Sequence, residues 1–236
     1  MEEMKIKKYL GVLACGIAVI ASGIFFASGI YAYLTDQADA MGNNFTIALQ
    51  PSHVIVEKFP SDGQVTPTPT GNRIEYEKAV QVANTGYLDE YVRVRLDFTD
   101  SEIRDKSKFS WDGTHFYSAD PNAADSYVKH LPEGWVYDPT DEFFYYKPIV
   151  YADDFKAFEN QYLELDATQY RYFYKVDADI QKNKIITVPL IRYVRTDFLN
   201  PKDMESYGIN IVAQSCPFYG GSDYKEAWAN YNPNDF

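Results

Sequence analysis

The sequence predicts an all-β protein, an antiparallel β-sandwich with a few short helices. Apolar and polar residues alternate with a period of two along many segments, which is the pattern of half-buried strands. The 21 Tyr and 15 Phe favour strands and large buried contacts. Strand-like segments also follow one another across turns, without the strand–helix rhythm of parallel sheets. We therefore expect two antiparallel layers around one core.

The clearest strand runs from Tyr91 to Phe98. One side holds apolar residues and the other side charged ones: Val92, Val94, Leu96 and Phe98 against Arg93, Arg95 and Asp97. This alternation predicts a strand with one face in the core and one in water.

A strand over 74–82 is expected just before it. One face holds apolar residues and the other polar ones: Ile74, Tyr76, Val80 and Val82 against Glu75, Glu77 and Gln81. The turn at 84–86 (Asn-Thr-Gly) separates the two strands and predicts either a hairpin or a connection between sheets. In a hairpin, Glu75 or Glu77 would pair with Arg93 or Arg95.

The rest of the chain adds shorter elements and two insertions. Further strands are expected at 44–49, 52–58, 143–151, 170–176, 184–194 and 208–214, and a loop at 61–70. Helical spacing occurs at 154–163 and at 222–231, where Tyr224, Ala227, Trp228 and Tyr231 share one face. Irregular insertions are expected near 101–142 and 152–183.

The N-terminus predicts export. Three lysines precede an uncharged apolar run from Tyr9 to Leu34, and small residues cluster near its end. We expect a signal peptide over 1–32, with cleavage between Ala32 and Tyr33 and a β-sandwich domain over 33–236. The alternative is an uncleaved membrane anchor, because the run would span about 39 Å as a helix.

The charge balance excludes a nucleic-acid partner. The whole chain has a formal net charge of −12, and its basic residues are scattered rather than clustered. Cys216 is the one cysteine after residue 32, so no disulfide can form within the mature chain. A buried thiol is expected there, and a disulfide to another chain is the alternative. Stability must therefore come from packing.

Four blocks, taken in order, resemble one known family. They are Ala32–Asp36 with Asn43–Thr46, Val82–Gly86 with Tyr91–Val94, Glu142–Lys147 with Val188–Leu190, and Tyr207–Gln214 with Ala227–Trp228. They are similar to the TasA/camelysin family of exported proteins of Gram-positive bacteria, whose precursors are processed by a dedicated SipW-type signal peptidase. The chain departs from the pattern at 215–217 (Ser-Cys-Pro) and in the enlarged segments 101–142 and 152–183.

The resemblance implies a jelly-roll-like sandwich and a secreted structural protein of a biofilm matrix or surface fibre. Its partners would be further copies or related matrix subunits, besides the signal peptidase. The candidate assembly strand consists of Asn44, Phe45, Ile47 and Leu49. Inserted into a neighbour's sheet, this strand would add a ladder of main-chain hydrogen bonds. The alternative is that the strand packs in its own sandwich.

A metalloprotease, a calcium-binding protein and a glycan-binding protein are the alternative functions. A camelysin-like surface metalloprotease would need clustered ligands, but His53, His115 and His130 are far apart and form no zinc motif. We therefore expect no enzyme activity, cofactor or resident metal. Acidic loops at 120–125, 138–142 and 153–154 lack the spacing of a calcium site. Trp111, Trp135 and Trp228 raise glycan binding as a third possibility, with burial in the core as the alternative.

Overall fold

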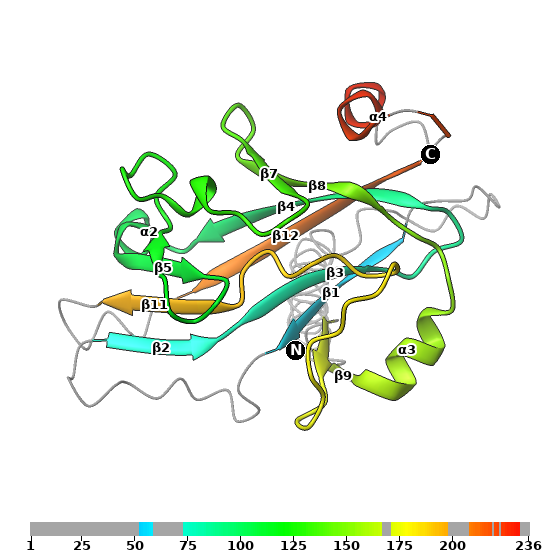
Figure 1. The fold of residues 1–236 in the computed structure, drawn as a ribbon, viewed down its shortest axis with the longest axis horizontal. Helices are drawn as coiled ribbons and strands as arrows, with labels where there is room; N and C mark the ends of the chain where they lie inside the picture. Colours follow the sequence, from blue (N-terminus) through cyan, green and yellow to red (C-terminus); the bar gives the residue numbers. More distant parts are fainter. Residues whose placement is uncertain are drawn as a thin grey trace, which may run out of the picture. The chain divides into compact units, whose positions relative to one another are not determined.

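The computed structural model of the protein describes residues 52–58, 73–166, 171–197, 208–218, 220–221 and 223–231. The chain divides into two units, Met1–Thr46 and Ile47–Phe236, and the described residues all belong to the second. For them the all-β class is confirmed, since their strands form three sheets and their helices are few and short (Figure 1). The predicted signal peptide, the strand 44–49 and the loop 61–70 lie outside these residues.

The first sheet, which we call sheet C, has four antiparallel strands in the order β12-β4-β8-β7. They are β4 (Glu90–Phe98), β7 (Trp135–Asp138), β8 (Phe143–Val150) and β12 (Ile209–Pro217). Val92 lies opposite Tyr146 of β8 and Ser215 of β12. Val92 and Val94 are buried, and Arg93 between them is half-buried. The predicted alternation of this strand is confirmed.

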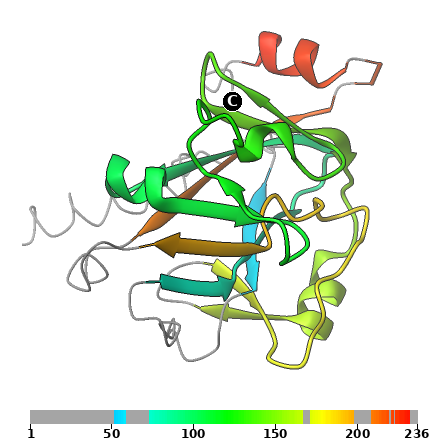
Figure 2. The ribbon, with the colours of Figure 1, turned by 60° about the vertical axis from the view of Figure 1, so that its left-hand side comes forward.

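Two further sheets, A and B, form one layer. Sheet A contains β3 (Ala79–Asn84), β1 (His53–Lys58), β10 (Arg171–Tyr174) and β9 (Leu163–Asp166), in that order. Sheet B contains β2 (Arg73–Glu77), β11 (Tyr193–Asp197), β5 (Ser107–Ser110) and β6 (Tyr117–Ser118), in that order. Only Lys78 separates β2 from β3. Figure 2 shows β5 and β11 side by side in this layer.

The expected strand 184–194 is mostly irregular. A regular strand begins only at Tyr193, yet the preceding residues still bond to β3. Thr187 N–H donates to the Val82 carbonyl at 2.9 Å, and Leu190 N–H donates to the Val80 carbonyl at 2.8 Å. This irregular segment continues β11 along the far side of β3, so it joins sheets A and B through hydrogen bonds as well as through the chain.

The predicted pairing of Glu75 or Glu77 with Arg93 or Arg95 is wrong. The expected strand 74–82 is divided into β2 and β3, and β2 pairs with β11 rather than with β4. Glu75 Oε2 therefore accepts a hydrogen bond from Nε of Arg195 at 2.8 Å. The two strands on either side of the 84–86 turn belong to different sheets, so the turn is a connection between sheets and not a hairpin.

The expectation of purely antiparallel pairing also fails at one place. β1 and β10 are parallel, with Val56 opposite Tyr172. They are far apart in the sequence, so no tight turn fixes their relative direction. A buried ion cluster joins them instead: Glu57 forms an ion pair with Lys78, and its Oε2 lies 3.2 Å from Nη1 of Arg171.

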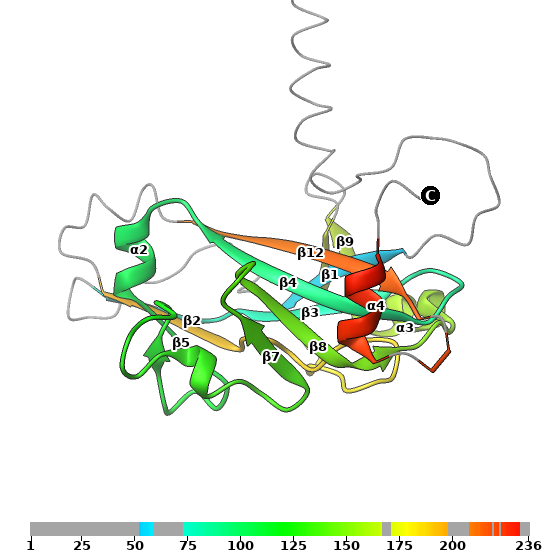
Figure 3. The same cartoon turned by 90° about the horizontal axis from the view of Figure 1, so that it is seen from above.

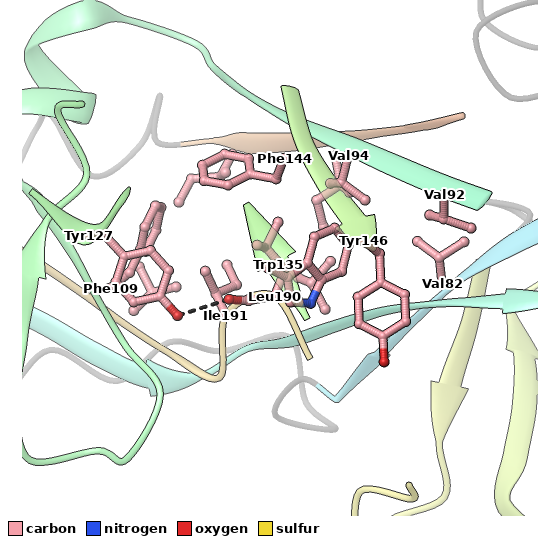
Figure 4. Packing of buried hydrophobic residues seen from close by; sticks show 14 of the residues in the cluster. Val82, Val92, Val94, Phe109, Tyr127, Trp135, Phe144, Tyr146, Leu190 and Ile191 are labelled. Atoms are coloured by element: carbon pink, nitrogen blue, oxygen red, sulfur yellow. Dashed lines mark hydrogen bonds between the residues drawn. The ribbon is translucent and has the colours of Figure 1, made fainter. Parts of the chain in front are cut away.

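The main core lies between sheet C and the layer of sheets A and B (Figure 4). From sheet C come Val92, Val94, Trp135, Phe144, Tyr146, Ile209 and Ile211, and from the other layer Tyr76, Val80, Val82, Phe109 and Val194. The Tyr127 hydroxyl donates to the Leu190 carbonyl at 2.8 Å, so its polar end is satisfied inside the core. Each such large side chain contributes about 1.5–3 kcal/mol when buried.

A second apolar cluster covers the opposite face of sheet A. It contains Val56, Ala83, Phe155, Phe158, Leu163, Tyr174, Ile185 and Ile186. The helix α3 (Phe155–Tyr162) contributes Phe155 and Phe158 to this cluster. Asp154 caps the helix, so the helix starts where the predicted span 154–163 starts. Because both faces of β3 are covered, all its residues are buried, including Gln81, which was expected on a polar face.

The insertion 101–142 is more regular than predicted. It begins with α2 (Ser101–Lys106), capped by Asp100, whose side chain accepts from the Glu102 N–H. It also supplies β5, β6, β7 and the short 3₁₀ helix η1 (Tyr127–Lys129). The second predicted helix is confirmed as α4 (Tyr224–Asn230), which lies across sheet C (Figure 3). Within the described residues, no helix is long and apolar enough to cross a bilayer.

Asn84 organises the connection between the two layers. Its Nδ2 donates to the carbonyls of Leu88 and Val150, at 2.7 and 3.1 Å, and its Oδ1 accepts from the Gly86 N–H at 2.8 Å. A Cβ on Gly86 would lie 3.2 Å from Ser52 N, just before β1, so a larger residue here would require Ser52 to shift slightly. The contacts of Asn84 and Gly86 therefore hold the connection from β3 to β4 in place.

Replacing Asn84 by Ala should destabilise the protein by about 2–3 kcal/mol, because three hydrogen bonds are lost, one of them buried and two part-buried. Urea unfolding of the mature chain measures the change. Asn122→Ala, at an exposed turn, is the matched control and should change stability by less than about 0.5 kcal/mol. Equal effects of the two substitutions would show that Asn84 does not hold the crossing.

Candidate functional site

The predicted site residues lie outside the described residues. These are Ala32 and Tyr33 at the cleavage position, and Asn44, Phe45, Ile47 and Leu49 in the assembly strand. The structure does describe the point where the chain enters β1. His53, the first residue of β1, contacts β12 through hydrogen bonds to Ala213 and Ser215.

The backbone of β12 has one side bonded to β4 and one side turned away. Thr99 N–H donates to the Gly208 carbonyl at 3.1 Å, and Phe218 N–H donates to the Asp89 carbonyl at 2.7 Å. In an antiparallel strand the N–H and C=O of one residue point to the same side, and the side alternates along the strand. Even-numbered residues of β12 therefore face β4, and odd-numbered residues face away.

We call the outward backbone groups the outer edge of β12. They belong to Ile209, Ile211, Ala213, Ser215 and Pro217. Proline, which has no N–H, is tolerated in a strand where its nitrogen faces an edge, and Pro217 has this orientation. Among the described strands, none pairs with this edge. Such edges are where another strand can add to a sheet.

The same odd-numbered residues point their side chains into the main core. Ile209 and Ile211 are buried in it, and Ala213 packs against it. On the opposite side, Val212 and Gln214 are half-buried. A strand added at the outer edge of β12 would thus place every second side chain beside Ile209 and Ile211, over the same core.

His53 occupies part of this edge. Its Nε2 donates to the Ala213 carbonyl at 3.1 Å, and its Nδ1 lies 2.8 Å from the Ser215 hydroxyl. The Ala213 carbonyl is one of the outward backbone groups, and the contact with Ser215 is made by the side chain of the next outward residue. Ser215 is 4% exposed, so its hydroxyl is closed to solvent.

Glu90 is buried in the same corner of the molecule. It is fully buried, and no hydrogen bond of normal geometry reaches either carboxyl oxygen among the described residues. Burial raises the pKa of Glu90 well above its usual value, and the Ser215 hydroxyl opposes this effect only in part. Burial, reinforced by Glu90, also raises the pKa of the Cys216 thiol to about 12. The expected buried thiol is confirmed, since Cys216 is 1% exposed.

Glu90→Gln should make the protein less sensitive to alkaline pH. A carboxyl whose pKa is raised by folding keeps its proton while the unfolded chain loses it, so stability falls as the pH rises above the ordinary value of 4.5. Glutamine does not titrate. Thermal unfolding should show a melting temperature higher by about 3 °C or more at pH 8, and little change at pH 4.

The exposed Glu164→Gln serves as the control for this measurement, because that side chain loses little water on folding. Its melting temperature should follow the wild type at both pH values. A Glu90→Gln variant that loses stability equally at pH 4 and pH 8 would contradict a Glu90 whose pKa is raised by burial.

A second polar cluster lies on the other face of sheet C. The guanidinium of Arg93 lies over the rings of Phe143 and Trp228, at 4.1 and 4.3 Å from their centres. It donates to Asp141 Oδ2 at 3.1 Å and to Gln214 Oε1 at 2.8 Å. Cation–π contacts of this kind hold α4 on the sheet. The spacing of Tyr224, Ala227, Trp228 and Tyr231 predicted the apolar face of α4, but nothing in the sequence indicated that this face would contact Arg93.

The histidines do not form a metal site. His53 bonds to β12, the His115 ring lies 2.7 Å from Asp112 Oδ2, and the His130 ring stacks on Tyr117 at 3.7 Å. In the described part of the chain, no group of three His, Cys, Asp or Glu residues is placed to hold a metal ion. No set of ligands for a metalloprotease is therefore found among these residues.

The acidic loops already use their carboxylates. Asp120 accepts from the Asn122 N–H, Asp138 from Thr140, and Asp154 caps α3. The pKa of Asp138 is lowered by the Thr140 hydroxyl and N–H, and that of Asp153 by its contact with Lys184. These groups stabilise turns and pair with bases, as solvated acidic turns do.

The three tryptophans do not form one face. Trp135 is 4% exposed, and its indole N–H donates to the Val188 carbonyl at 2.8 Å inside the core. Trp228 lies on the outer side of sheet C, and Trp111 lies near Lys182. Trp135 is therefore a core residue and is not available to stack on a sugar.

The chain matches no family model, no curated protein and no solved structure. The resemblance to the TasA/camelysin family therefore stays a prediction from the four sequence blocks. The feature that best suggests a function is the outer edge of β12, with the chain entry beside it.

Proposed function

We propose that this protein is a secreted structural component of an extracellular matrix or surface fibre, which assembles by strand addition at the outer edge of β12. The two packed layers would then be a jelly-roll-like sandwich of the TasA/camelysin type. Export would use the segment 1–32 and a dedicated signal peptidase, and contact with the membrane would be limited to that segment before cleavage. This role needs no catalytic residue, cofactor or metal.

The observation that carries the proposal is the match between the edge and the segment before β1. The edge presents backbone groups at every second residue, and its inward side chains are apolar, as with Ile209 and Ile211. In the assembly strand, Phe45, Ile47 and Leu49 also alternate. A strand paired with β12 would turn these three side chains to the core and satisfy the edge hydrogen bonds together.

Assembly follows if the strand enters a neighbour. The donor segment and the acceptor edge are different surfaces of one chain, so the contact is head-to-tail. Such a contact either closes into a ring or continues as a filament. In the unassembled protein the same segment can pair with its own β12, which would protect the edge until assembly.

The alternatives have less support. For a metalloprotease, the described residues contain no ligand set. For glycan binding, Trp135 lies in the core and the other two tryptophans lie in different places. Neither function has a specific observation in its favour.

The test compares two substitutions in the donor segment of the mature chain that begins at Tyr33. Ile47→Asp places a charge where the alternation turns the side chain to the core, and it should abolish fibres seen by electron microscopy. Thr46→Asp adds the same charge at a position that faces outward, and it should leave assembly within about twofold of the wild type, because an exposed charge costs little.

Two results would contradict the proposal. One is a wild-type mature chain that stays monomeric under all conditions tested. The other is equal assembly of the two variants, which would show that assembly does not depend on which side chains of the segment face the core.

A further inference from the structure

His53 is placed where an added strand must bind. Its Nε2 donates to the Ala213 carbonyl at 3.1 Å, and that carbonyl belongs to the outward set of β12. A new strand needs the same carbonyl for its ladder. The two interactions use one acceptor from the same side, so they compete.

A second bond holds the ring in this position. Nδ1 lies 2.8 Å from the hydroxyl of Ser215, two residues further along the same edge. The ring therefore bridges two successive outward positions of β12. A carbonyl can only accept, so Nε2 carries a proton, and the two contacts together fix the orientation of the ring.

The backbone of β1 supports the ring. β1 pairs with β3 from His53 opposite Asn84 to Lys58 opposite Ala79. Alternate residues of β1 face the two clusters: Ile55 packs against the main core, and Val56 lies in the second cluster. His53 has the facing of Ile55, toward sheet C. Its approach to β12 is thus set by the strand and does not depend on a loop.

We infer that His53 is a releasable cap on the outer edge of β12, which an added strand must displace at Ala213 and Ser215. This inference rests on the proposed function and adds its regulation. Natural sheets protect edges with local devices that hinder pairing. A hydrogen-bonded side chain at one end of the edge closes that end and leaves Ile209 and Ile211 as the place where pairing begins.

The cap predicts a direction for assembly. The added strand pairs first near Ile209 and Ile211 and reaches Ala213 last, when the ring leaves. Removing the ring should therefore speed assembly rather than slow it. A purely structural histidine would give the opposite result, because its loss would weaken the sheet that accepts the strand.

The experiment follows fibre formation by the mature chain beginning at Tyr33, with light scattering for the lag and electron microscopy for the product. His53→Ala should shorten the lag at least about threefold, which is the factor expected from loss of one typical hydrogen bond. His53→Gln, which keeps a side-chain donor, should restore much of the lag. His115→Ala, at an exposed histidine away from β12, is the matched control and should not change it.

Ser215→Ala provides a second variant, because it leaves the ring but removes the hydroxyl that orients it. Its lag should also shorten, and its stability should be less affected than that of His53→Ala. Wild-type fibres with an unchanged or longer lag in both variants would overturn the cap and leave strand addition intact. If neither the wild type nor any variant assembles, strand addition itself fails and the cap with it.

Discussion

The contact between sheet C and the layer of sheets A and B determines the rest of the structure. Alternating side chains from β4, β8 and β12 meet those of β2, β3, β5 and β11 in one core. Burial of these side chains fixes the facing of these strands, since a slip of one residue would turn each apolar set into water. Among the described residues Cys216 is a free, buried thiol, so packing rather than a disulfide stabilises this part of the chain.

The same constraint explains the chemistry of the β12 edge. Once Ile209 and Ile211 face the core, their backbone groups must face either β4 or the outside, and the register with β4 makes it the outside. The corner beside this edge is unusually polar for a buried place. His53 meets Ser215 there, and within the described part of the chain no hydrogen bond of normal geometry reaches the carboxyl oxygens of the buried Glu90. A buried carboxyl costs stability above its ordinary pKa, so this corner loses stability as the pH rises.

How far the sequence predicts this structure depends on whether a segment meets one core or two. The strand Tyr91–Phe98 faces one core, and its alternation predicted its facing. α3 and α4 also follow from spacing, and the Asp154 cap marks the start of α3. β3 is different, because clusters cover both its faces and bury Gln81, whose side chain bonds to Thr187 and Tyr174. In a strand that is covered on both faces, a polar residue such as Gln81 wrongly predicts an exposed face.

The site was harder to predict than the strands. Nothing in the local sequence of His53 or Ser215 indicates that they meet, because they are 162 positions apart. The parallel pairing of β1 with β10 was hard to predict for the same reason, because the two strands are far apart in the sequence. By contrast, Asn84, Thr85 and Gly86 could be identified as a turn from their types, and the structure adds a reason for Asn84 and for Gly86. The assembly strand at 44–49 rests on its own alternation and on the family resemblance.

The most direct test is residue-resolved hydrogen exchange on fibres of the mature chain, compared with the unassembled Ile47→Asp variant. If the strand 44–49 pairs with the outer edge of β12, the outward amides of Ile211, Ala213 and Ser215 exchange more slowly in the fibre. The amides of Val212 and Gln214, which face β4, should be protected in both samples and serve as internal references. Equal exchange of the outward amides in fibre and variant would contradict strand addition at this edge.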